Sequence, residues 1–146
     1  VCELDERLLT TPSIALERCR VVTNEMADVA AVTLRDAAAA LQNYTPELAQ
    51  AVWEGESKTD HYEDILGTYL VQLSARKMGV DESEEATELL KSIGDFERIS
   101  DHAVNILESA EELRGKSLAF SAAAARDSLI RRCTGKYPFS ASRICA

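Results

Sequence analysis

Two stretches of the sequence carry the same pattern of acidic side chains. Residues 56–61 and residues 97–102 both have the pattern E-x-x-x-D-H. Because an α-helix repeats every 3.6 residues, a spacing of four places each Glu and the following Asp on one face, one turn apart. A single pair of this kind is common on solvated helices. Two copies at one height would bring together four carboxylates, those of Glu56, Asp60, Glu97 and Asp101.

Four clustered carboxylates need a compensating positive charge, because anions repel one another and burying each one unpaired costs about several kcal/mol. Lys58 and Arg98 lie inside the two motifs but off the Glu/Asp face, so they can shield the carboxylates only from the side. A multivalent cation is the simplest solution. Ligand sets made of oxygen alone suit Mg²⁺, Ca²⁺, Mn²⁺ or ferric iron, and bridging carboxylates can hold more than one ion.

The neighbours of these residues are weaker candidates. Asp64 and Asn105 continue the two faces one turn further on and are secondary candidate ligands. His61 and His102 lie about 100° around the helix from their Asp, so we expect them to support the ligands or face solvent rather than bind the metal. The competing interpretation of the whole cluster is a solvated acidic face.

Signatures of enzymes are weak. Neither histidine has a Glu three residues before it, as di-iron carboxylate bundles require. The sequence offers no glycine-rich phosphate loop and no Ser-His-Asp or Cys-His arrangement at a recognisable spacing. Gly67 and Gly94 fall inside helical stretches, where close helix packing explains them better than a ligand cradle. We therefore predict a protein that is not an enzyme, with a metal-dependent hydrolase as the least favoured interpretation.

Three long helices must position the motifs. Thr11-Pro12 and Thr45-Pro46 indicate helix starts, and Gly79 after a lysine indicates a helix end. Asp81 with Glu84 suits a capping box, and Gly115 closes the third segment. These signals predict helices at 12–44, 46–78 and 82–114, joined by short turns into an elongated antiparallel three-helix bundle. On this turn geometry the two motifs lie nearly level, about three residues or 4.5 Å apart.

Apolar side chains recur at steps of three and four along each predicted helix, as a core-facing seam requires. In the second and third helices these seams contain carboxylates where a core residue is expected. The seams are Ala15, Cys19, Val22, Met26, Val29 and Thr33; Ala49, Val52, Glu56, Thr59, Glu63, Leu66, Leu70 and Leu73; and Ala86, Leu90, Ile93, Glu97, Ser100, Val104 and Leu107.

Composition limits the class of protein. With 146 residues, a formal net charge of −9 and 46% hydrophobic residues, the chain is long enough for one acidic domain with a core. This charge argues against nucleic-acid binding and against docking on an anionic membrane, and no apolar run is long enough to insert into a bilayer. Four scattered cysteines, among them Cys19 on an apolar face, favour a reducing, cytoplasmic environment. The absence of an initial methionine suggests a fragment of a longer protein.

The residues around the motifs resemble those of a known family. Residues 54–60 (EGESKTD) and 93–106 (IGDFERISDHAVNI) are similar to the PhoU family, and the second block is the more specific. Residues 4–7 (LDER), 11–16 (TPSIAL) and 66–70 (LGTYL) are closest to the PhoU-like C-terminal domain of bacterial sodium/phosphate cotransporters. The resemblance covers about residues 3–113. It divides the chain into a three-helix domain at 3–114, a single PhoU-like repeat, and a remainder at 115–146 that includes a candidate short fourth helix near 117–132.

The resemblance implies a function as well as a fold. It implies a cytoplasmic, metal-binding regulatory domain in sodium-dependent phosphate uptake, at the inner face of the membrane through a transporter membrane domain in the same longer chain or in a partner. Its ligands would be Glu56, Asp60, Glu97 and Asp101, holding a multinuclear cluster of Fe, Zn or Mn, with Mg or Ca as alternatives. Because the family usually has two repeats and six helices, we expect a homodimer of this single repeat. The alternative function is a helical interaction or scaffold module without metal.

Overall fold

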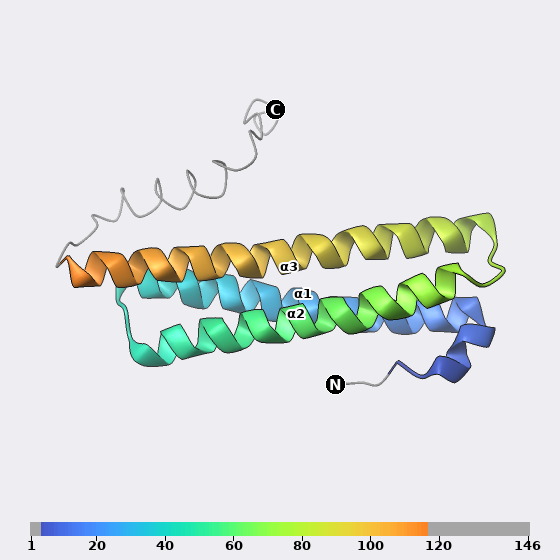
Figure 1. Ribbon diagram of the computed structural model, residues 1–146, viewed down its shortest axis with the longest axis horizontal. Helices are drawn as coiled ribbons and strands as arrows, with labels where there is room; N and C mark the ends of the chain where they lie inside the picture. The colour runs from blue at the N-terminus through green and yellow to red at the C-terminus, as the bar shows by residue number, and fades with distance from the viewer. Residues whose placement is uncertain (1–3, 117–146) are drawn as a thin grey trace, which may run out of the picture.

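The computed structural model describes residues 4–116, which form three long helices side by side. They are α1 (Pro12–Gln42), α2 (Pro46–Ser74) and α3 (Val80–Gly115), preceded by a short 3-10 helix, η1 (Glu6–Thr10). Figure 1 shows α1 and α3 running in one direction and α2 in the other. Each long helix packs against both others, and the described residues include no strand. The predicted all-α three-helix bundle is confirmed.

The helix starts follow the sequence signals in part. At α2 the Leu48 N–H donates to Thr45 Oγ1 at 3.2 Å, so the predicted cap is present before Pro46. The capping box expected from Asp81 and Glu84 is wrong. The Gly79 N–H instead donates to Glu82 Oε2 at 3.0 Å, which makes Gly79 the first cap of α3 and not the stop of α2.

The second helix ends at Ser74, four residues before the predicted end. Ala75, Arg76 and Lys77 are all exposed, so extending the helix through them would bury no apolar surface. The chain turns there, and Met78 packs against the apolar core. The helix therefore ends before the lysine and glycine that the sequence marks as its stop.

The core has two apolar clusters, one toward each end of the bundle. We call the group toward the α2–α3 turn the first cluster and the group toward the α1–α2 turn the second cluster. The first includes Cys19, Val22, Met26, Leu66, Leu70, Leu73, Ala86 and Ile93, and the second includes Ala37, Ala40, Ala49, Val52, Ala103, Ile106 and Leu107. Most predicted seam positions are therefore buried.

Small and polar side chains separate these clusters at the middle of the bundle. Thr33 of α1, Thr59 of α2 and Ser100 of α3 are each at most 1% exposed, and Gly55 is buried beside them. We call these four residues the polar layer. The two acidic motifs lie at this height, because Thr59 and Ser100 belong to them.

Some predictions concern residues outside the described part of the chain. The fourth helix at 117–132, the remainder of 115–146 beyond Lys116, and Cys2, Cys133 and Cys145 all belong to this group. Cys19 is a free, buried thiol as expected, and burial, with the charge of Glu85, raises its pKa to about 11. Among the described helices, none is both long enough and apolar enough to cross a membrane.

Candidate metal centre

A hydrogen bond joins two buried hydroxyls, one from each acidic motif. Ser100 Oγ donates to Thr59 Oγ1 at 2.9 Å. Each of these residues is the fourth in its motif, directly before the aspartate. Because equivalent positions face each other, the motifs have no offset at this point, whereas the sequence predicts three residues. Packing across the helices, and not symmetry about the turn, fixes their height.

The same layer brings α1 very close to α2. Thr59 Oγ1 donates to the Gly55 carbonyl at 2.8 Å, and Thr33 Oγ1 donates to the Val29 carbonyl at 2.8 Å. A Cβ atom placed on Gly55 would lie 2.0 Å from Thr33 Oγ1 and 3.0 Å from Thr33 Cβ. Only glycine fits at this point of contact, so Gly55 sets how closely α2 approaches α1.

The charges of the two motif aspartates act on both motif glutamates. Burial raises the pKa of Glu56, and the charges of Asp60 and Asp101 raise it further. Burial also raises the pKa of Glu97, and Asp101 and Asp60 contribute to the same shift. Each glutamate is therefore coupled to the aspartate of the other helix. The four predicted ligands thus interact through their charges between α2 and α3.

A fifth carboxylate joins the group. The charge of Glu63, which is partly buried, also raises the pKa of Glu97. The sequence places Glu63 in the apolar seam of α2 but does not include it among the candidate ligands. Its spacing nevertheless indicates this position, because Glu63 lies seven residues after Glu56 and so occupies the same helix face two turns on.

Arg98 is the motif cation whose charge acts on Glu97. Arg98 Nη1 donates to Asp95 Oδ1 at 3.1 Å on its own helix, and its charge only opposes the rise in the pKa of Glu97. As the side chains stand, no three His, Cys, Asp or Glu residues within 4–116 come close enough together to hold one metal ion. The carboxylate oxygens suit a hard cation, but they are not arranged around a single point.

The secondary candidates are placed differently. Asp64 and His61 line a hollow under the N-terminal segment, together with Asp5, Arg7 and Tyr69. Asn105 Nδ2 donates to the Asp101 carbonyl at 2.8 Å, so its amide nitrogen is turned toward its own helix. His102 is partly buried and His61 is exposed. Their expected supporting roles stay predictions.

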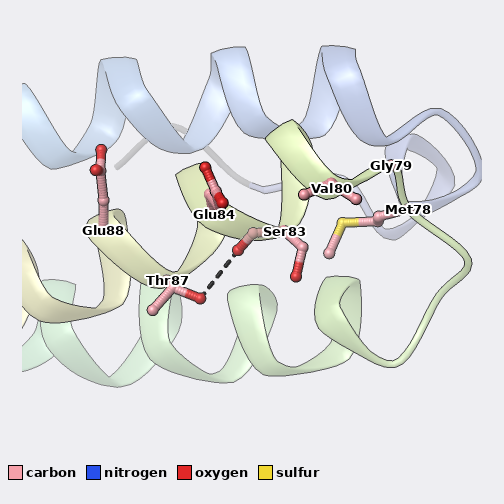
Figure 2. A pocket seen from close by; sticks show the side chains of 7 residues that line it. All are labelled: Met78, Gly79, Val80, Ser83, Glu84, Thr87 and Glu88. Atoms are coloured by element: carbon pink, nitrogen blue, oxygen red, sulfur yellow. Dashed lines mark hydrogen bonds between the residues drawn. The ribbon is translucent and has the colours of Figure 1, made fainter.

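A second hollow lies at the α2–α3 turn, away from the polar layer. Figure 2 shows Thr87 Oγ1 donating to the Ser83 carbonyl, at 2.9 Å, within its lining. The lining consists of Met78, Gly79, Val80, Ser83, Glu84, Thr87 and Glu88. The two carboxylates that line this hollow, those of Glu84 and Glu88, both belong to α3. The motif carboxylates come from two helices, α2 and α3, so the hollow lacks their arrangement on facing helices.

Comparison with known proteins adds a family. The family model described as the PhoU domain matches residues 23–110, which include both motifs and all of the polar layer. No curated protein and no solved structure matches the chain.

Proposed function

The chain belongs to the PhoU domain family, and from that premise we propose that it is a metal-binding regulatory domain of a sodium-dependent phosphate transport system. The family implies a role in regulating phosphate uptake, and its members act as regulators rather than as enzymes. The metal and the transporter are our proposals. The observation that supports the metal is the coupled set of carboxylates at the polar layer, in which Glu56 and Glu97 both have raised pKa values.

The donor set decides which ions fit. Glu56, Asp60, Glu97 and Asp101 offer only oxygen atoms, and two come from each of two facing helices. Carboxylates can bridge ions, so a multinuclear cluster of Fe, Zn or Mn suits this set, with Mg or Ca as alternatives. Asp60 and Asp101 are exposed, which leaves their side chains room to rotate toward an ion. Bound metal would add positive charge between the carboxylates of α2 and α3.

The physical effect of a bound cation follows from the repulsion that it removes. Without metal, the carboxylates of α2 and α3 repel one another, and the charges of Asp60 and Asp101 raise the pKa of Glu56 and Glu97. A multivalent cation reverses the sign of that interaction and ties α2 to α3. A ligand that binds only the folded chain also stabilises it by mass action, so loading should raise the melting temperature.

The test is elemental analysis of the chain purified without a metal-affinity tag. The parent should hold Fe, Mn or Zn, or take one up when all three are added. The double variant E56Q/E97Q should hold none, because it removes one ligand from each helix. The matched control is E84Q/E88Q, which makes the same change of charge in the hollow at the α2–α3 turn. Metal that survives in E56Q/E97Q, or a parent that binds none, would show that the site is wrong.

We also propose where and with what the domain works. The partner is the membrane domain of a phosphate transporter, in the same longer chain or in a second one, and the domain lies at the cytoplasmic face of the membrane. A pull-down with the membrane domain of a sodium/phosphate cotransporter tests this, and failure to bind with and without metal would refute it.

One observation favours a second candidate, a helical interaction module without metal. No three potential ligands within residues 4–116 are arranged around a common point. On this alternative the acidic groove is simply solvated, and the same elemental analysis separates the two functions.

A further inference from the structure

Two hydroxyls in the core are unusual because they lie where a three-helix bundle normally places apolar side chains. Thr59 is 0% exposed and Ser100 is 1% exposed, and they lie between the first and second clusters. The two form a short chain of hydrogen bonds, in which Ser100 donates to Thr59 and Thr59 donates to the Gly55 carbonyl. Neither side chain faces solvent, so neither can itself take part in binding an ion at the surface.

A buried polar pair in an apolar seam can specify the register of two packed helices. Leu, Ile and Ala side chains pack with similar energy after a helix slides by one turn, whereas a buried hydrogen-bonded pair is satisfied in one register only. Here a slide of α3 along α2 would separate the Ser100 hydroxyl from its acceptor and leave a buried polar group unpaired. The pair therefore favours one relative height of the two helices.

That height is the one that aligns the acidic motifs. In both helices the hydroxyl residue comes three positions after the glutamate and one position before the aspartate. A slide of one turn, about 5.4 Å, would move each carboxylate past its counterpart on the other helix. Glu56 and Glu97 would then lose their coupling to the aspartates across the groove.

We propose that Thr59 and Ser100 are positioning residues, which fix the register of α2 against α3 and thereby set the metal affinity of the four carboxylates. The effect on metal affinity rests on the proposed function, whereas the fixing of the helix register does not. Groups that orient ligands without touching the ion typically change affinity about 10–100-fold when they are removed.

The variant S100A tests the proposal with little risk to folding, because Thr59 keeps its bond to the Gly55 carbonyl. We expect a loss of affinity for Mn²⁺ of about 10–100-fold by calorimetric titration. The conservative variant S100T keeps the donor and should bind Mn²⁺ like the parent. The control is T23V, which removes a buried hydroxyl of α1 that has no hydrogen-bond partner in the described part of the chain, and should leave the affinity unchanged.

Spin labels measure the register without any metal. Thr68 of α2 and Lys91 of α3 are exposed, and each lies nine residues along its helix from the hydroxyl pair, so they are level in the native register. With labels on cysteines at these two positions, in a chain whose four native cysteines are replaced by alanine, the distance distribution should be narrow in the parent. It should broaden in S100A and become narrow again in S100T.

The outcomes separate the two proposals. Parent-like Mn²⁺ affinity in S100A would overturn the positioning role, even if the parent binds metal well. A parent that binds no metal would refute the proposed function, and the label distances would then decide the register role alone. Broadening in S100A that S100T reverses supports that role, and an unchanged distribution in S100A overturns it.

Discussion

Replacing each of three helical glycines by alanine should give opposite effects on stability. Gly55, Gly67 and Gly94 all lie inside helices, so each change gains about 0.5–1 kcal/mol of helix propensity. An added Cβ meets no atom within 4 Å at Gly94 and only Ile93 Cδ1, at 3.8 Å, at Gly67. We therefore expect G94A and G67A to stabilise the chain by about 0.5–1 kcal/mol each.

At Gly55 the same methyl group collides with α1. Its distances of 2.0 Å to Thr33 Oγ1 and 3.0 Å to both Thr33 Cβ and Thr33 Cγ2 mean that rotating the Thr33 side chain cannot relieve the contact. The helices must separate by about 1 Å, which puts the cost at the upper end of the usual range for overpacking, about 3 kcal/mol. After subtracting the gain in propensity, G55A should destabilise the chain by about 2 kcal/mol.

Urea denaturation followed by helical circular dichroism measures these differences. The free energy of unfolding of G55A should lie about 3 kcal/mol below that of G94A, from the two estimates combined. In the double variant G55A/T33A the contacts to Oγ1 and Cγ2 disappear and only the contact to Cβ remains, so part of the loss should return. If G55A is as stable as G94A, then α1 and α2 do not approach as closely as the structure indicates.

Three further predictions concern charge, a buried hydroxyl and assembly. Because Glu56 and Glu97 have raised pKa values in the folded state, their contribution favours folding below the ordinary carboxyl range and is lost as the pH rises through the raised values. The melting temperature of the metal-free chain should therefore rise as the pH falls through the range just above the ordinary carboxyl pKa, and E56Q/E97Q should flatten this slope; an equal slope in that variant would refute the coupling. Thr23 has a buried Oγ1 without a hydrogen-bond partner in the described part of the chain, so T23V should raise the free energy of unfolding by about 1 kcal/mol in urea, and a loss would contradict this. Light scattering at micromolar concentration should give twice the chain mass of 16.0 kDa if the single repeat pairs with a second copy, and a monomer mass would refute the dimer.

The sequence predicts the helices and the motifs well because their signals are local. The four-residue spacing of Glu56 and Asp60 fixes a shared helix face, and Thr45 with Pro46 marks a helix start, in any fold that contains them. Counting from the turn places the two motifs only about three residues from level, and the contact of Ser100 with Thr59 removes that offset.

The remaining features depend on distances between helices, which no local pattern records. From the sequence, Gly67 and Gly94 look as suited to close packing as Gly55 does, yet nothing lies near an added Cβ at Gly94. The contact falls at Gly55 because Thr33 lies opposite it on α1. Likewise, η1 is too short for a periodic signal, and Met78, just after α2, packs against residues distant in the sequence.

The division of the core into two clusters also has a mechanical consequence. Apolar burial supplies most of the cohesion between helices, and here it is divided between two clusters with hydroxyl side chains and one glycine between them. The carboxylates lie at the height of this layer, so a change in their charge acts on α2 and α3 where apolar burial contributes least to their contact.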